Sequence, residues 1–403
     1  MGASAAAGVA GAVALADPAL SAAQAVGVKP GDLPDLTIKE VKVYVTDISG
    51  VRRLNEENGE IASVVTNSGI EGNATLRPRM FHPNWTNLGW LDNAKRTLVG
   101  KNVMNFAQIT SQWSNRGQGQ SSYAVVHDTC MWDILGKAVG LPIYKILGAY
   151  KDKQMAYASS AHLRTVEEYG PDVLKAKAEG FKAYKIHPGS GQMASGPPIP
   201  AWKGHIEEIK LVRKTAGDDM ILLFDPVQRY SRDEAMKVGR ALQEYDFIAF
   251  EDPIPTTDIT GLVDLARALD IPVEVGEFIF SIYDFPEYFL RGALDIARLI
   301  CDNLGGITGA MKVGRMAECF GINCTPHNWG EQMDLACHFH VELALPNAPW
   351  FEMPFPQTGP DRPYHKDRLR IDKDGYVPAP KAPGLGYPLD RDALDKITKR
   401  IDR

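Results

Sequence analysis

Six polar residues recur at a nearly constant spacing in the second half of this 403-residue chain. They are Asp225, Glu251, Glu277, Asp302, His327 and Glu352, at successive separations of 26, 26, 25, 25 and 25 residues. Each one follows a short apolar run, so each is expected to close a β-strand. In a barrel of alternating strands and helices, one strand and one helix of this combined length bring the chain back to the same end of the next strand. The spacing therefore predicts one ring of side chains at the carboxyl ends of the strands.

Three of these residues, Asp225, Glu251 and Glu277, come from neighbouring strands in this scheme. Three carboxylates in a partly dry site repel one another strongly unless a cation offsets their charge. Ligation by oxygen alone suits a hard divalent ion, with Mg²⁺ as the first choice and Mn²⁺ as the second. A single acid at a strand end is better explained as a solvated or ion-paired group, but three in phase favour a metal site.

Basic side chains are expected to flank these three acids, which we call the acidic trio. Lys185 and His187 close an earlier apolar run, and their i, i+2 spacing on a strand points both side chains the same way. His327 comes from the other side of the ring. One base on each side of a bound carboxylate substrate could exchange a proton at either face of its α-carbon. The remaining histidines lack this phase and are expected to be structural: His82, His127, His162, His205, His338, His340 and His365.

The elements that must position these residues alternate between short apolar runs and amphipathic helix patterns, which is typical of βαβ units. Eight runs are predicted to be strands: 155–161, 181–187, 220–225, 247–251, 272–277, 297–302, 322–327 and 349–352. Eight such strands predict a closed α/β barrel, a (β/α)-barrel of the TIM type, over residues 155–360. An open doubly wound sheet is the alternative, but no Gly-x-Gly-x-x-Gly follows any of the runs.

The segment before the barrel predicts a separate α+β domain at residues 36–154. Residues 36–48 and 62–75 alternate apolar and polar residues, as strands of an antiparallel sheet do. Residues 76–92 are loop-like. Residues 122–147 indicate a buried helix, a Gly-x-Pro break and a second short helix.

Composition narrows the class of protein. The chain is 44% hydrophobic and 23% charged, with a net charge of −6, which is ordinary for a soluble globular protein. No basic run suggests a nucleic-acid partner, and no apolar run past the leader is long enough to span a bilayer. The five cysteines form no Cys-x-x-Cys pair, so reduced, buried thiols are expected.

Residues 1–27 are rich in Ala and Gly and end in Ala-Gln-Ala, a small-x-small cleavage pattern. Two interpretations fit equally. The segment resembles the apolar and cleavage regions of an export signal without its basic start, or it is an Ala-rich tail. The first would place the protein in the periplasm and the second in the cytoplasm. In both cases residues 1–35 are a leader outside the predicted fold.

The predicted barrel strands, the acidic trio with its spacing, the Lys-x-His, the GGITG at 305–309 and His327 together resemble the enolase superfamily, mandelate racemase subgroup. The segment 124–149 is similar to the segment that joins cap to barrel in that family. The segment 373–386 is similar to its returning tail. The resemblance covers about residues 36–390.

This resemblance implies a modified, enolase-like barrel with an N-terminal capping domain, completed by a C-terminal tail at residues 361–403. It also implies that Mg²⁺ binds the substrate carboxylate, that the α-proton leaves, and that the metal stabilises the enediolate. Lys185 and His187 match the two positions of a Lys-x-Lys pair, and His327 matches the second base. Glu352 matches the acid that hydrogen-bonds the developing enediolate oxygen.

Three positions depart from the family pattern. His187 replaces the second Lys, which gives a weaker base that can be neutral near pH 7. The Asp that usually orients the strand-seven His falls at Ile300, and Asp302 is expected to take over that role. Val227 stands where an Asn often lies two residues after the first metal ligand.

The favoured function is a dehydratase of sugar acids, which removes the proton α to the carboxylate and eliminates the β-hydroxyl. His187 or His327 would be the base, and the other the acid. A polar loop is expected to contact substrate hydroxyls, although a solvated surface loop explains it equally well; its residues are Arg77, Arg79, His82 and Asn84. A small-molecule carboxylate is the expected partner, and the protein is expected to be a homo-oligomer.

Other functions stay open at this point. A racemase or epimerase of a 2-hydroxy or sugar acid needs only the two opposed bases. A non-catalytic binding protein that retains the fold would not need the intact acidic trio and both histidines. A binuclear metal hydrolase would need a His-x-His on the first barrel strand, where only His162 is present at the edge.

Overall fold

The computed structural model describes residues 33–47, 58–76, 87–111, 123–195, 197–330, 332–356, 362 and 364–403. Within this part of the chain, Pro34–Arg403 forms one compact unit. The leader expected at 1–35 falls almost entirely outside the described residues, as do Arg77, Arg79, His82 and Asn84. Among the described helices, none combines the length and the apolar character that crossing a bilayer requires.

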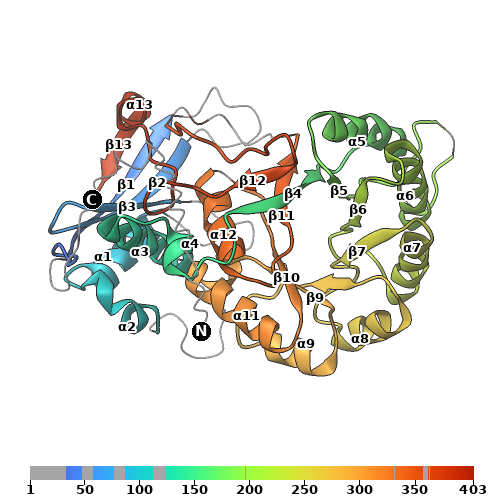
Figure 1. Cartoon of the computed structure of the whole chain (residues 1–403), viewed down its shortest axis with the longest axis horizontal. Helices are drawn as coiled ribbons and strands as arrows, with labels where there is room; N and C mark the ends of the chain where they lie inside the picture. Colours follow the sequence, from blue (N-terminus) through green and yellow to red (C-terminus); the bar gives the residue numbers. More distant parts are fainter. Residues whose placement is uncertain are drawn as a thin grey trace, which may run out of the picture. The chain divides into compact units, whose positions relative to one another are not determined.

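The N-terminal sheet is antiparallel, as the sequence predicts, in the order β13-β1-β2-β3 (Figure 1). Its strands are β1 (Ile38–Asp47), β2 (Asn58–Thr66), β3 (Glu71–Thr75) and β13 (Thr398–Asp402). The single strand predicted at 62–75 is wrong, because a turn at Asn67–Ile70 divides it into β2 and β3. Gly69 has a φ of 84° at this turn, a conformation that glycine adopts without steric cost.

Helices cover one face of this sheet with a shared core. They include α1 (Asn87–Leu98), α2 (Phe106–Ser111) and α3 (Ala124–Val139), and the short helix α4 (Ile143–Ile146) follows α3. Trp90 of α1 and Ile134 of α3 are fully buried against Val64 and its neighbours. The break predicted between two helices is confirmed: α3 ends at Gly140, with a φ of 71°, and Pro142 precedes α4. The loop predicted at 76–92 is wrong in its last part, which belongs to α1.

The second sheet contains the eight predicted parallel strands, in the order β10-β9-β8-β7-β6-β5-β4-β11. They are β4 (Lys153–Ser160), β5 (Ala183–Ile186), β6 (Ile221–Phe224), β7 (Phe247–Glu251), β8 (Val273–Val275), β9 (Ile296–Leu299), β10 (Asn323–Pro326) and β11 (Phe351–Phe355). The first and eighth strands pair with each other, Ala156 opposite Phe351. β10 and β11, at the two ends of the order, also lie in contact. The predicted barrel is confirmed and is nearly closed.

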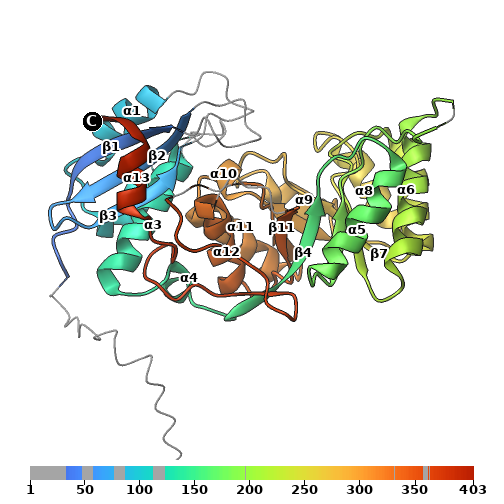
Figure 2. The same ribbon diagram turned by 90° about the horizontal axis from the view of Figure 1, so that it is seen from above.

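Helices follow the strands and cover the outside of the barrel, where α6–α8 flank β5–β8 (Figures 1 and 2). They are α5 (Tyr169–Ala178), α6 (Ala201–Ala216), α7 (Arg232–Glu244), α8 (Ile259–Ala268), α9 (Phe285–Arg291), α11 (Ile307–Cys319) and α12 (Gln332–Ala344). In α7, Ser231 and Glu234 form a capping box that fixes the start of the helix. Ala235, Val238 and Leu242 then recur at helical spacing and are buried.

Two of the six predicted strand ends differ in the structure. β9 ends at Leu299, and Asp302 lies in the short helix α10 (Cys301–Leu304). The Cys301 amide donates a hydrogen bond to Nε2 of His338, 3.0 Å away, instead of continuing the ladder. Glu352 is the second residue of β11, because the apolar run continues to Phe355. The prediction that Asp302 and Glu352 close their strands is therefore wrong.

The C-terminal tail returns to the N-terminal sheet, as the sequence predicts. β12 (Tyr376–Pro378) pairs with β4, and β13 follows α13 (Arg391–Ile397) and pairs with β1. Between them, the Leu385 amide donates to the buried carboxylate of Asp133 on α3, at 2.9 Å. The sheet of the capping domain thus contains both ends of the described chain.

The segments 124–149 and 305–309, whose sequences resemble the enolase superfamily, contact each other. Oδ2 of Asp128 on α3 accepts a hydrogen bond of 3.0 Å from the Thr308 amide, at the start of α11. Trp132 donates a 3.0 Å hydrogen bond to the Thr308 hydroxyl. Gly306 has a φ of 100°, and a Cβ there would lie 2.3 Å from the Asp128 carboxylate. The glycines of GGITG therefore let the barrel approach the capping helix closely.

Candidate active site

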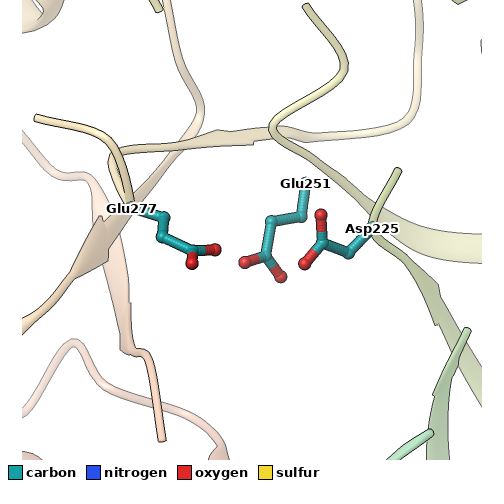
Figure 3. Close-up of side chains that lie close together, drawn as sticks. All are labelled: Asp225, Glu251 and Glu277. Carbon is teal, nitrogen blue, oxygen red and sulfur yellow. The ribbon is translucent and has the colours of Figure 1, made fainter. Parts of the chain in front are cut away.

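The acidic trio converges at the carboxyl ends of three adjacent strands. Asp225 follows β6, Glu251 ends β7 and Glu277 lies two residues beyond β8. One oxygen from each carboxylate lies within 4.8 Å of one oxygen of each of the other two. Figure 3 shows Glu251 between Asp225 and Glu277. The predicted convergence of the three acids is present in the structure.

The chain turns sharply after two of these acids. Val227 and Gln228 after β6 have φ values of 54° and 59°, and Asp252 after β7 has a φ of 32°. Such values cost a non-glycine residue about 1–3 kcal/mol each and recur at functional sites. The Val227 amide donates a 2.8 Å hydrogen bond to Oδ1 of Asp225. The backbone of this position, whose side chain departs from the family pattern, therefore helps to orient the Asp225 carboxylate.

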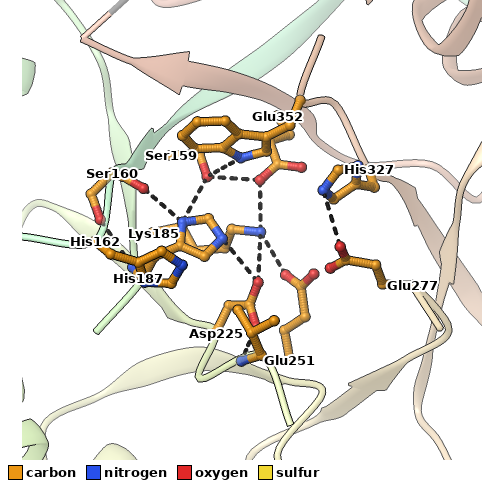
Figure 4. Close-up of polar contacts among 12 residues, drawn as sticks. Ser159, Ser160, His162, Lys185, His187, Asp225, Glu251, Glu277, His327 and Glu352 are labelled. Atoms are coloured by element: carbon orange, nitrogen blue, oxygen red, sulfur yellow. Dashed lines mark hydrogen bonds and ion pairs between the residues drawn. The ribbon is translucent and has the colours of Figure 1, made fainter. Parts of the chain in front are cut away.

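His187 and His327 lie at opposite ends of the acidic trio (Figure 4). Nε2 of His187 is 2.9 Å from Oδ2 of Asp225, and Nε2 of His327 is 3.5 Å from Oε1 of Glu277. Nδ1 of His187 lies 2.7 Å from the Ser160 carbonyl, which only accepts, so Nδ1 carries a proton and donates it. A substrate bound over the acids would have one imidazole on each side.

Burial governs the charges of this site. Burial lowers the pKa of His327 to about 3, so its ring is neutral at pH 7. Burial and the Asp225 charge raise the pKa of Glu277 to about 8. Burial alone would raise the pKa of Asp225, but His187 and Lys185 hold it below its ordinary value. These pKa shifts hold for the site without a bound cation. A bound cation would favour the ionised form of the carboxylates.

Two buried cations lie beneath the trio. Nζ of Lys185 is 2.6 Å from Oε2 of Glu251, 2.7 Å from Oε1 of Glu352 and 3.7 Å from Oδ2 of Asp225. Nε of Arg298 on β9 is 2.7 Å from Oε1 of Glu251, and its Nη2 contacts Glu352. Sequence reasoning missed Arg298. The available signal was a single charged residue inside an apolar strand.

The acidic trio fits a divalent metal. When ionised, its three carboxylates and Glu352 carry more negative charge than the positive charges of Lys185 and Arg298 can neutralise. Asp225 and Glu251 are at most 1% exposed, so water cannot screen that excess. Carboxylate oxygens are the donors that Mg²⁺ and Mn²⁺ prefer. Asp225, Glu251 and Glu277 are therefore the residues that would hold such an ion.

Two further aromatic side chains surround His187. The rings of His162 and Trp329 lie 5.3 Å and 5.6 Å from its ring, both edge to face. The sequence predicts a structural role for His162, but the structure makes it a neighbour of the site. Trp329, two residues after His327, is 37% exposed and was not singled out by its spacing. His340 matches its predicted structural role, since its ring bonds to the Tyr144 amide and the Leu385 carbonyl.

The predicted pair of Asp302 and His327 is not tested by these contacts. The contact recorded for the His327 ring is with Glu277, and Asp302 lies on α10 rather than on β9. Asp302 as the group that orients His327 stays a prediction. The substrate contacts predicted for Arg77, Arg79, His82 and Asn84 also stay predictions, because these residues lie outside the described part of the chain.

The sequence of this chain is similar to those of known enzymes. Residues 170–393 match the model of the enolase C-terminal domain-like family. The arabinonate dehydratase of Saccharolobus solfataricus is 31% identical over 70% of this chain and 73% of its own. The L-talarate/galactarate dehydratase of Salmonella typhimurium is 28% identical over 73% of this chain and 72% of its own.

A solved structure extends the likeness to the capping domain. The D-glucarate dehydratase of Agrobacterium tumefaciens, complexed with magnesium, has a TM-score of 0.77 and 28% sequence identity. The match covers 91% of this chain and 100% of that one. The N-terminal sheet, the barrel and the returning tail therefore follow an arrangement found in a magnesium-binding dehydratase.

Proposed function

The chain belongs to the enolase C-terminal domain-like family, and from this premise we propose that it is a Mg²⁺-dependent dehydratase of sugar acids. The observation that carries the proposal is one imidazole at each end of a three-carboxylate cluster. The chain is an enzyme of the enolase superfamily, and the relatives described above are dehydratases of acid sugars. A sugar acid is therefore the substrate class we propose.

Each residue of the site has a task in this proposal. Bound Mg²⁺ would supply positive charge to the substrate carboxylate, which makes the neighbouring C–H bond more acidic. One imidazole takes the α-proton, and the other gives a proton to the β-hydroxyl, which leaves as water. The enol that remains tautomerises to a 2-keto-3-deoxy acid. Glu352, held by Lys185 and Arg298, would face the reacting carboxylate and act on the developing enediolate oxygen.

His327 is the better candidate for the base. Its ring is neutral at pH 7 because burial lowers its pKa. His187 is held by the Ser160 carbonyl and Asp225, so its ring is less free to turn a lone pair toward a substrate. Lys185 is engaged by three carboxylates and stays charged, which suits an electrostatic role rather than proton transfer.

A racemase or epimerase on the same site is the second candidate. The same two-sided arrangement of His187 and His327 favours it, since proton removal on one face and return on the other needs nothing more. The two candidates differ in their product, because only the dehydratase loses water.

A screen of acid sugars with Mg²⁺ tests the proposal directly. We expect a 2-keto-3-deoxy product from at least one sugar acid, and its loss after exhaustive chelation. Glu251→Gln, which keeps the shape of the side chain, should lower turnover about a thousand-fold or more, because the metal site loses a charged ligand. Full activity of that variant or of the chelated enzyme would contradict the proposal. Change of configuration without loss of water would favour the second candidate.

A further inference from the structure

One interior layer of the barrel is built from charges. Side chains inside a (β/α)-barrel stack in layers of four from alternate strands, and bulky aliphatic residues normally fill them. Here the alternate strands β5, β7, β9 and β11 contribute Lys185, Glu251, Arg298 and Glu352. All four side chains are at most 1% exposed.

These four residues, which we call the charged layer, form a closed ring of alternating sign. Lys185 contacts Oε2 of Glu251 at 2.6 Å and Oε1 of Glu352 at 2.7 Å. Arg298 contacts the other oxygen of each, Oε1 of Glu251 at 2.7 Å and Oε2 of Glu352. Every carboxylate oxygen in the layer therefore has its own cation, and neither carboxylate can rotate without losing an ion pair.

Arg298 is itself held in one orientation. Its Nη1 lies 2.9 Å from the Tyr157 hydroxyl and 3.4 Å from both the Thr325 carbonyl and Oε1 of Glu274. A planar guanidinium can serve these acceptors and two carboxylates at once, whereas a Lys ammonium in its place could not. Arg298 is also fully buried.

We propose that Arg298 is a positioning residue of the metal site, which fixes the Glu251 carboxylate for the ion and couples it to Glu352. The inference rests on the proposed function for the identity of the ion. A carboxylate that already has a fixed partner on each oxygen presents its remaining lone pairs in one direction. Partners of this kind, one step removed from the metal, typically contribute about 10- to 100-fold to metal affinity or activity.

Substrate-free Mg²⁺ titration by calorimetry tests this role on the full chain. We expect Arg298→Met and Arg298→Lys each to raise the Kd for Mg²⁺ about 10- to 100-fold. Lys at position 298 should not restore Mg²⁺ affinity, because an ammonium group lacks the planar set of N–H donors that a guanidinium uses to hold both carboxylates. Wild-type affinity in the folded Arg298→Lys variant would overturn the proposal, since charge alone would then suffice.

Arg213→Met is the matched control. Arg213 is a partly buried arginine, and it donates to the carbonyls of Tyr245, Gly217, Met220 and Asp246, none of which belongs to the charged layer. Its loss should lower the thermal unfolding midpoint and leave the Kd for Mg²⁺ within about twofold. An equal loss of Mg²⁺ affinity in this control would reduce the Arg298 effect to general destabilisation and overturn the inference.

Glu352→Gln is an independent test that leaves Arg298 itself unchanged. Glu352 is not one of the three proposed ligands, yet the ring predicts a several-fold weaker Kd for Mg²⁺ in this isosteric variant. If neither Arg298 variant folds, this measurement decides, and an unchanged Kd overturns the coupling. Failure of the proposed function looks different: the wild type would bind Mg²⁺, with the same variant pattern, but convert no sugar acid.

Discussion

At the scale of single residues, the two histidines differ in what holds their rings. His187 is fixed by Ser160 and Asp225 and enclosed by the rings of His162 and Trp329. Among the described residues, the His327 ring forms one ion-pair contact, with Glu277 at 3.5 Å. An imidazole with few fixed partners can turn its lone pair to a substrate, whereas one held by two acceptors is committed to donating.

This difference predicts separate losses in two variants. His327→Asn should abolish exchange of the substrate α-proton with solvent deuterium. His187→Asn should keep some exchange but lose the dehydrated product, since proton transfer by either group contributes about 10²- to 10⁴-fold. Nuclear magnetic resonance of a converted sugar acid in deuterium oxide measures both quantities. Unchanged turnover in both variants would remove the histidines from the chemistry.

At the scale of elements, Asp133 of α3 ties the capping domain together. Its buried carboxylate accepts hydrogen bonds from the Asn73 amide of β3 at 3.0 Å and the Leu385 amide of the tail at 2.9 Å. Lys137 contributes an ion pair at 2.6 Å. One side chain therefore connects a strand, a helix and the returning tail, which are up to 312 residues apart in the sequence (73 to 385).

Removing this carboxylate should loosen the tail. Asp133→Ala leaves two buried amides without an acceptor, so we expect a loss of about 2–4 kcal/mol in the free energy of unfolding. Trypsin should also cleave the tail faster at Lys381, which is exposed. Asp264→Ala is the control, because its side chain is 61% exposed and a change within about 0.5 kcal/mol is expected. Wild-type stability of Asp133→Ala would contradict this role.

At the scale of the whole molecule, one buried acid should make stability depend on pH. Glu208 on α6 is fully buried, and among the described residues no hydrogen-bond partner is recorded for either carboxylate oxygen. Burial raises its pKa to about 8, against the attraction of Arg229. The folded protein therefore keeps this proton up to about pH 8, while the unfolded chain releases it near pH 4.5.

The sign of the effect follows from this difference. Between about pH 5 and pH 8 the folded state binds more protons at Glu208, so its contribution to stability falls as pH rises, by about 1.4 kcal/mol per pH unit. Above about pH 8 the contribution levels off. Glu208→Gln should lower the measured slope by this amount in urea unfolding at pH 5.5, 7 and 8.5. Glu207→Gln, at an exposed neighbouring position, should keep it; equal slopes in the wild type and Glu208→Gln would disprove the assignment.

The sequence alone determined the period of the fold and the identity of the acidic trio. Each βα unit has nearly the same length, so Asp225, Glu251 and Glu277 had to reach the same end of the barrel. His187 and His327 followed from the same phase. The antiparallel sheet, the helix break at Gly140 and the barrel strands were also predictable, because alternation, glycine and proline act locally.

Only the tertiary structure decided what depends on contacts across the barrel. Arg298 looked like one polar residue in an apolar strand, and its partners Glu251 and Glu352 are 47 and 54 residues away. The place of Asp302 on α10 depends on a hydrogen bond from Cys301 to His338 on another helix. The aromatic rings around His187 come from segments on either side of it in the sequence. Alternate strands share a layer only after the sheet curls, so no local pattern reveals which charges meet inside it.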